Sequence, residues 1–202
     1  MNRGFEVVNN VIDEEQCNQL IEALPDINAS GTRTLLDIPI FVAVVERCRS
    51  HHRLAQLIGC MAAVQCTYFR KSQENNWAIR LHRDRVVPLR GKGPWKGSGV
   101  KEGMNFVEPP NSFLSQCLAV RINLDSAMEG DLSVVPDTHD GGTELKKNAA
   151  ISVPVPKGGA LVMRPTIGHA SSKLENAPHR RVLHYLFAPT QLPDSYGWYH
   201  AT

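Results

Sequence analysis

The chain has 202 residues and a formal net charge of +2, and 42% of its residues are hydrophobic and 21% charged. This length and composition are typical of one folded domain that buries a core without disulfides. The small net charge does not indicate a nucleic-acid partner, and no stretch approaches the roughly 20 apolar residues of a membrane-spanning helix. The five cysteines form no CxxC pair and the first ten residues lack an apolar segment, which predicts free thiols and a cytoplasmic location.

The first third of the chain carries helical patterns. In segment 11–24 the apolar residues recur at helical spacing, and Asp13 is placed to cap the first turn. Segment 37–59 repeats this spacing, with Asp37 as the candidate cap and Gly59 as the residue that ends the helix. We therefore expect residues 1–60 to form a helical brace.

From residue 62 onward the chain consists of short strand-like runs separated by Gly, Pro, Asn and Asp. Helices followed by many short strands predict a mainly β barrel or sandwich rather than alternating βαβ units. In run 118–124 the apolar residues alternate with Arg121 and Asn123, so one face is suited to pack under the helices and the other to line a polar site. We expect a single domain over all 202 residues, with its β core at 62–190.

A His-x-Asp pair lies in the run WAIRLHRDR. Strand alternation directs Arg80, His82 and Asp84 to the same face. One imidazole and one carboxylate aimed at one point are two of the three protein ligands of a 2-His-1-carboxylate iron site, and an exposed ion-paired strand is the alternative. A second histidine is needed downstream, where His139 in PDTHDGG and His169 in TIGHASS are both candidates, and spacing alone does not choose between them.

The ordered set NWAIRLHRDR, FVEPP, LAVRINLD, GDLSVVPDTH, GHASS and RRVLHYLFAP resembles the phytanoyl-CoA dioxygenase family of Fe(II)/2-oxoglutarate-dependent oxygenases. The likeness runs from Cys66 to Pro189 and rests on the order of the motifs. It implies a double-stranded β-helix, a cupin-like jelly-roll barrel with the N-terminal helices packed on one sheet. It also implies Fe(II), 2-oxoglutarate and O2 as the cofactor and cosubstrates.

The resemblance assigns roles to individual residues. It assigns iron to His82, Asp84 and His169, and the distal carboxylate of 2-oxoglutarate to Arg180. Strand alternation allows only one of Arg180 and Arg181 to point into the pocket, and the family pattern favours Arg180. Further candidates for the cosubstrate pocket are Ser171, Thr67 and Arg121, and candidates for substrate contact are Lys71, Arg80, Trp95 and Asn105.

Three features bear on the family pattern. Leu81 and Arg83 replace the usual Trp and Gln around His82, and Arg83 is expected to point away from the metal. The turn 127–130 is shorter than in the family. Asp84 is retained, which disfavours halogenation because halogenating relatives carry a small residue in place of this carboxylate.

The resemblance implies hydroxylation of a C–H bond of a small-molecule metabolite, such as an amino acid or a natural-product intermediate, with release of succinate and CO2. The Gly- and Pro-rich segment 90–110 is expected to be a lid loop without secondary structure of its own, and a mobile solvated loop is the alternative. Trp95 could cover an apolar part of the substrate, and Lys92, Lys96 or Lys101 could attract an anionic group.

Two other hypotheses compete with the oxygenase. A cupin-like module could bind metal and ligand without turnover, although the complete ligand set argues against this. A metal-independent barrel could carry LHRDR as an exposed ion-paired strand. No pattern in the sequence specifies the number of subunits.

Overall fold

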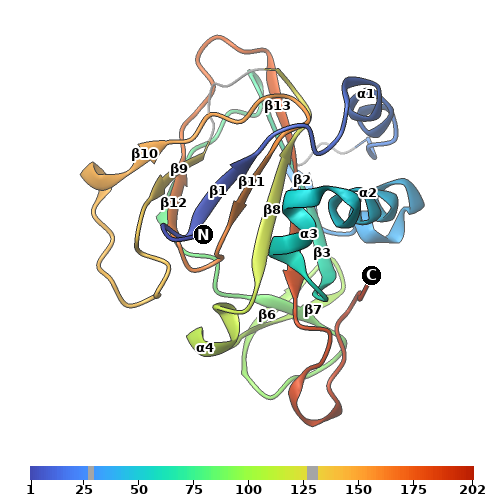
Figure 1. The fold of residues 1–202 in the computed structure, drawn as a ribbon, viewed down its shortest axis with the longest axis vertical. Helices are drawn as coiled ribbons and strands as arrows, with labels where there is room; N and C mark the ends of the chain where they lie inside the picture. Colours follow the sequence, from blue (N-terminus) through green and yellow to red (C-terminus); the bar gives the residue numbers. More distant parts are fainter. Residues whose placement is uncertain (27–29, 127–131) are drawn as a thin grey trace.

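Two antiparallel sheets form the body of the molecule in the computed structural model, which describes residues 1–26, 30–126 and 132–202 (Figure 1). The larger sheet consists, in spatial order, of β1 (Phe5–Val8), β11 (Ala160–Met163), β8 (Leu118–Asn123), β13 (His179–Ala188), β3 (Ala62–Ser72) and β2 (Gly31–Thr32). The smaller sheet consists of β10 (Ile151–Ser152), β9 (Leu132–Val135), β12 (Gly168–Ser171) and β4 (Ile79–His82). Most strands of the two sheets lie between β3 and β13, and β1 and β2 of the larger sheet precede them in the chain.

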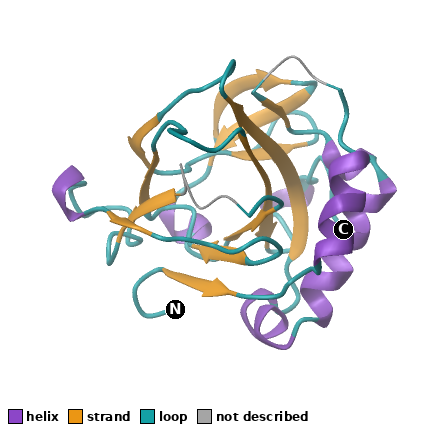
Figure 2. Cartoon of the chain, turned by 90° about the horizontal axis from the view of Figure 1, so that it is seen from above, coloured by secondary structure: helices purple, strands orange, loops and turns teal. Residues whose placement is uncertain are grey.

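The helices pack on the outer face of the larger sheet (Figure 2). They are α1 (Glu14–Glu22), α2 (Pro39–Ser50) and α3 (His52–Ile58), and a further short helix, α4 (Asn111–Leu114), precedes β8. The predicted cap of α1 is confirmed, because the Asp13 carboxylate accepts a hydrogen bond from the Gln16 backbone N–H at 2.8 Å. No helix in the described part of the chain is both long and apolar enough to cross a membrane.

Segment 37–59 is not one continuous helix, and its expected cap is wrong. It divides at His51 into α2 and α3. Asp37 lies in the 3-10 turn Leu35–Asp37, and α2 begins with Pro39 instead. Proline suits this position because it has no N–H to be capped and its fixed φ matches the helix.

The expected helical brace also contains two strands. β1 pairs with β11 and β2 pairs with β3, both antiparallel, so residues 1–60 complete the two edges of the larger sheet. These strands are four and two residues long. Their pairing partners lie far along the chain, so local pattern could not reveal them.

The alternation expected in β8 is confirmed. Leu118, Val120 and Ile122 lie in the core between the larger sheet and the helices. Ala119, on the opposite face, packs in a second core with residues of β9 and β11. One part of the space between the two sheets is therefore filled by apolar side chains. Arg121 and other polar side chains line the remaining part.

Segment 90–110 is not an irregular loop, contrary to expectation. It contains β6 (Lys96–Lys101) and β7 (Met104–Glu108), which form a three-stranded sheet with β5 (Val87–Leu89). Glu102 and Gly103 have φ values of +50° and +79°. This backbone suits a two-residue hairpin turn. The glycine-rich sequence of β6 hid the strand, because glycine is depleted in strands and leaves no alternation to recognise.

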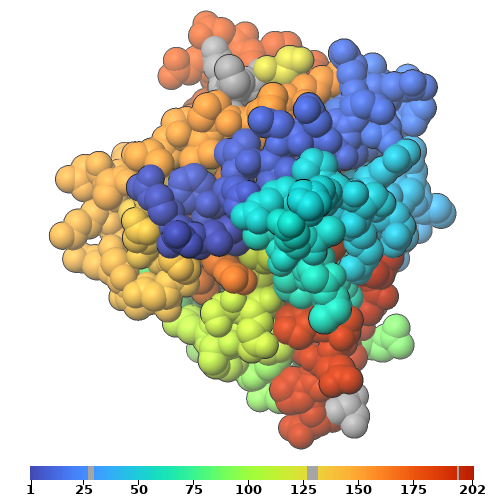
Figure 3. All heavy atoms as spheres, viewed as in Figure 1, coloured from blue at the N-terminus to red at the C-terminus, as the bar shows by residue number. Residues whose placement is uncertain are grey.

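The three-stranded sheet lies at the lower end of the molecule in Figure 1. Trp95 packs on Phe113 with ring centroids 4.7 Å apart, and Phe113 lies 6.0 Å from the ring of Trp198. The C-terminal segment, red in Figure 3, accordingly lies beside the region of α4 at this end.

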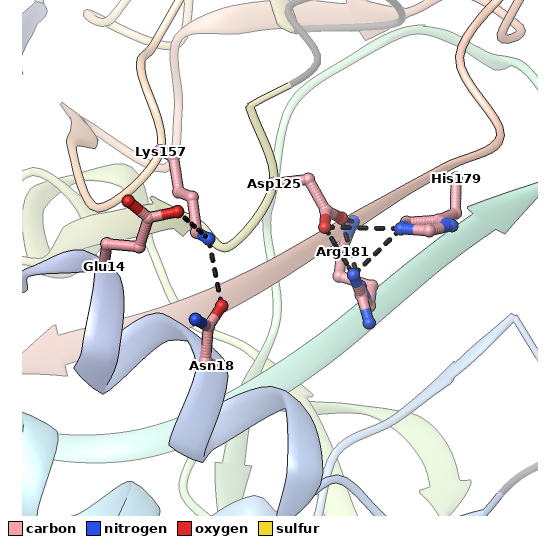
Figure 4. Close-up of polar contacts among 6 residues, drawn as sticks. All are labelled: Glu14, Asn18, Asp125, Lys157, His179 and Arg181. Atoms are coloured by element: carbon pink, nitrogen blue, oxygen red, sulfur yellow. Dashed lines mark hydrogen bonds and ion pairs between the residues drawn. The ribbon is translucent and has the colours of Figure 1, made fainter.

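A buried carboxylate joins β8 to β13 on the outer face. The Asp125 carboxylate accepts hydrogen bonds from the backbone N–H and the guanidinium of Arg181, both at 2.6 Å, and His179 lies beside them (Figure 4). The Asp125 side chain is only 10% exposed. The nearby pair of Glu14 and Lys157 is similar in charge, but the Glu14 side chain is 79% exposed.

Asp125→Ala is expected to lower the free energy of unfolding by about 2 kcal/mol, because two donors of Arg181 lose a buried acceptor. Glu14→Ala is the matched control and is expected to change it by less than about 0.5 kcal/mol, since exposed ion pairs contribute little. Urea denaturation measures both values. An equal loss of unfolding free energy in the two variants would contradict the stabilising role of the buried contact between Asp125 and Arg181.

Candidate metal centre

Three potential metal ligands converge between the sheets. His82 on β4 and His169 on β12 are paired across the two strands, and their ring centroids are 4.2 Å apart. The two oxygens of Asp84 lie 3.5 Å from His82 Nε2 and 3.6 Å from His169 Nε2. One ligand atom from each residue lies within 4.8 Å of the others. Two imidazoles and one carboxylate at one point are the donor set of a facial mononuclear site.

Backbone carbonyls orient both imidazole rings. His82 Nδ1 lies 2.8 Å from the Arg80 carbonyl, and His169 Nδ1 lies 2.9 Å from the Ile167 carbonyl. A carbonyl can only accept, so each Nδ1 carries a proton. Both Nε2 atoms are thereby directed at the space beside Asp84.

The surroundings also set the protonation states that a metal requires. Burial alone raises the pKa of Asp84, but the charges and hydrogen bonds of His169, His82 and His184 hold it well below its ordinary value. A hydrogen bond to Asp84 raises the pKa of His82, whereas burial lowers the pKa of His169. The carboxylate is therefore ionised and His169 is neutral, as metal coordination demands.

A β-bulge redirects β4 just before the metal centre. His169 pairs with His82, but Ser171, two residues later, pairs with Ile79, three residues earlier on β4. The extra residue interrupts the alternation. The expectation that Arg80 shares the face of His82 is therefore wrong, because Arg80 is exposed while Ile79 lines the cavity.

Arg83 points away from the metal centre, as expected. Its guanidinium donates to the carbonyls of Thr166 at 2.8 Å and Thr138 at 3.3 Å, and also to that of Thr143. The Asp84 backbone N–H donates to the Pro165 carbonyl at 2.9 Å. These bonds hold the chain beyond β4 in place although it is no longer part of a sheet.

Two adjoining cavities meet at His82 and Asp84. The first, of about 190 Å³, lies between the sheets and is lined by His169, Thr67 and Arg121 as well. The second, of about 600 Å³, opens beside β2 and shares Thr67 with the first. Thr67 and Arg121, expected in the cosubstrate pocket, are thus beside the metal centre.

The remaining cosubstrate candidates, Ser171 and Arg180, form a buried cluster with Lys71, which was expected to contact the substrate. Lys71 Nζ donates to Ser171 Oγ at 2.6 Å and also to the Ser172 carbonyl, and Arg180 Nη2 donates to Ser171 Oγ at 3.3 Å. Lys71 and Arg180 are paired across β3 and β13, and both are at most 2% exposed. Neither lines the two cavities. Arg181 faces the opposite way, as alternation predicts.

The cluster concentrates positive charge in a buried place. Burial lowers the pKa of Lys71 to about 7, and the neighbouring charges of Arg180 and Arg121 add to this effect. An ammonium group that has lost water and faces other cations is stabilised by an anion. The cluster is therefore suited to receive a carboxylate.

Two substrate candidates lie elsewhere. Trp95 and Asn105 line a third cavity, of about 370 Å³, within the glycine-rich hairpin. Neither lines the cavities at the metal centre. His139, the alternative second ligand, lies against Gly4 and is not part of the metal-ligand group. The turn 127–130 lies outside the described residues.

Sequence reasoning missed His184. Its Nε2 lies 3.9 Å from an Asp84 oxygen, its ring packs edge-on against Phe69, and burial lowers its pKa to about 4. Alternation along β13 places it on the same face as Arg180, and that signal could have revealed it. The structure thus surrounds Asp84 with three imidazoles.

Comparison with known proteins supports the fold. No protein-family model and no curated protein matches the sequence. The chain resembles crystal structures of HygX from Streptomyces hygroscopicus, determined with iron bound or with nickel and 2-oxoglutarate bound. For the nickel and 2-oxoglutarate complex the TM-score is 0.64 at 14% identity, covering 94% of this chain and 84% of HygX.

Two other solved structures are similar. AviO1 from Streptomyces viridochromogenes Tue57 has a TM-score of 0.61 at 18% identity, covering 95% of this chain and 92% of AviO1. The non-haem, α-ketoglutarate-dependent epimerase SnoN from nogalamycin biosynthesis has a TM-score of 0.61 at 13% identity, covering 94% of this chain and 80% of SnoN. At these identities the likeness establishes a shared fold.

Adding Mn(II) at about 100 times its dissociation constant is expected to raise the melting temperature of the protein by about 5 to 10 °C. Asp84→Ala is expected to lose this rise, because the carboxylate is the charged donor of the set. His184→Ala is the control and is expected to keep most of the rise, since His184 lies outside the group of three. Differential scanning fluorimetry measures the shifts, and an unchanged rise in Asp84→Ala would exclude the proposed ligand set.

Proposed function

We propose that the chain is a non-haem Fe(II)- and 2-oxoglutarate-dependent oxygenase related to the phytanoyl-CoA dioxygenase family. It hydroxylates a C–H bond of a small-molecule metabolite and releases succinate and CO2. The observation that carries this proposal is the convergence of His82, Asp84 and His169 on one point at a cavity between the sheets. The fold shared with HygX and SnoN, and the iron and 2-oxoglutarate bound in HygX, support it.

In this proposal the protein holds and orients the reacting groups. When bound, iron activates O2 and supplies the oxidising chemistry. His82, Asp84 and His169 would hold the metal, and a donor set of three leaves room for cosubstrate and O2. The two sheets, joined to a double-stranded β-helix, keep the site rigid and limit the access of water.

Lys71, Ser171 and Arg180 bind the distal carboxylate of 2-oxoglutarate in this proposal. Arg180 and His184 lie on the same face of β13, four residues or roughly 13 Å apart along the strand. Thr67 and Arg121 line the intervening space. The arrangement therefore matches a cosubstrate that extends from the metal to a buried cationic end.

The substrate enters through the second cavity. Its volume of about 600 Å³ and its shared contact with His82 and Asp84 suit a small molecule beside the metal. HygX has been crystallised with hygromycin B and SnoN with nogalamycin RO, which supports a small-molecule substrate here. The tip of the hairpin formed by β6 and β7 borders both cavities through Lys101 and Glu102, so this tip takes the role of the expected lid.

Anaerobic addition of Fe(II) and 2-oxoglutarate is expected to produce the weak visible charge-transfer band of chelated 2-oxoglutarate. His82→Ala is expected to abolish the band because it removes a metal ligand. His52→Ala changes an exposed histidine on α3 and is expected to retain it. Absence of the band in metal-loaded native protein would contradict the proposal, and a band without O2-dependent succinate would favour a non-catalytic binding module.

The affinity for 2-oxoglutarate is expected to fall as the pH rises from 7 to 9. Lys71, whose pKa is lowered to about 7, loses its charge over this range, and the loss reaches at most about tenfold per pH unit. Lys71→Met is expected to bind more weakly at pH 6.5 and to show no such slope. Titration of the charge-transfer band gives the affinities, with the exposed Lys96→Met as control. A flat profile in the native protein would rule out contact between Lys71 and the cosubstrate.

A further inference from the structure

We propose that the substrate carries a carboxylate or phosphate group, which Arg33 and Lys101 bind at the mouth of the metal cavity. This inference rests on the proposed function, since it names the class of molecule that the same site accepts. It combines three observations: the placement of the two cations, the carboxylate that fixes them, and the local balance of charge.

Arg33 and Lys101 come from separate parts of the chain to the same cavity. Arg33 follows β2, and Lys101 ends β6. Both line the cavity of about 190 Å³ that contains the metal ligands. Lys92 lines the hairpin cavity instead, and Lys96 lines neither cavity at the metal centre. The structure therefore selects Lys101 from the three lysines of the hairpin region.

Glu102 ties the two segments together. Its carboxylate accepts hydrogen bonds from Thr32 Oγ1 at 2.8 Å, from the Arg33 backbone N–H at 2.6 Å and from Arg33 Nη1 at 3.3 Å. Glu102 occupies a left-handed backbone position that few residues adopt. The tip of the hairpin is thereby held against the segment that carries Arg33, and the two cations stay on the same side of the site.

The charge at the mouth is not balanced by the protein. Glu102 forms an ion pair with Arg33. In the described chain no carboxylate lies within ion-pair distance of Lys101, whose Nζ is 5.7 Å from the ring centre of Phe106. Asp84 lines the same cavity but faces the imidazoles. An anionic group on the substrate would complete the charge balance.

The wall next to the cations is apolar. Phe106, Leu114 and Leu186 line the cavity, the Lys101 ammonium lies over the Phe106 ring, and the two leucines pack with residues of the three-stranded sheet. An apolar body can therefore lie against this wall while its anionic end reaches the two cations. A substrate with a cationic end in this position would be repelled by Arg33 and Lys101.

Binding of simple probes to the protein loaded with Mn(II) and saturating 2-oxoglutarate tests the inference. Mn(II) increases the relaxation rates of the protons of a bound molecule, which ¹H NMR detects. Hexanoate and hexyl phosphate are expected to show this effect, and a difference between them identifies the preferred anion. Hexanamide and hexylamine, with the same carbon chain, are expected to show little effect. Equal binding of hexanoate and hexanamide would overturn the inference.

Substitutions of two lysines in the hairpin test whether hexanoate binds at Lys101. Lys101→Ala is expected to weaken hexanoate binding about three- to tenfold, and Lys101→Glu to abolish it. Lys96→Ala is the matched control on the same strand and is expected to bind as the native protein does. An unchanged affinity in Lys101→Glu would overturn the inference.

Two further outcomes distinguish a failure of this inference from a failure of the proposed function. Displacement of hexanoate by a tenfold increase in 2-oxoglutarate would place the probe in the cosubstrate site and overturn the inference alone. Failure of the native protein to bind Mn(II) and 2-oxoglutarate would instead overturn the proposed function on which the inference rests. The water relaxation of the Mn(II)-loaded protein reports this binding directly in every variant.

Discussion

The site depends on one carboxylate shared by three imidazoles. Asp84 lies within 3.5 to 3.9 Å of ring nitrogens of His82, His169 and His184, which come from three strands of two different sheets. An ionised carboxylate inside a cavity is costly unless donors or cations surround it. The pairing of β4 with β12, and the position of β13 opposite them, supply these neighbours, so sheet topology and site chemistry cannot be separated.

The larger sheet makes this arrangement possible because its two faces differ. Its outer face is covered by the helices and contains the main apolar core. Its inner face is then free to carry Lys71, Arg121 and Arg180 in buried positions. The proposed binding of an anionic cosubstrate rests on this buried group of cations.

The hairpin of β6 and β7 connects fold and selectivity. Trp95, directly before β6, packs on Phe113 at one end of the molecule, and the tip of the hairpin borders the cavity at the metal centre. The bonds of Glu102 to the segment after β2 fix that tip. A segment that looked like a loop is thus a paired hairpin whose tip, rather than its middle, borders the site.

The sequence by itself predicted helical segments ahead of the β core and the two faces of β8, and it put forward His82 and Asp84 as ligand candidates, because alternation is a local property of the chain. The family resemblance added His169 and Arg180 as candidates. Only the tertiary structure decided the rest. It excluded Arg80 through a bulge that depends on pairing with β12, moved Trp95 and Asn105 away from the metal centre, and brought in His184 and Arg33. These outcomes depend on which distant strands pair and in what register, and a single strand pattern does not contain that information.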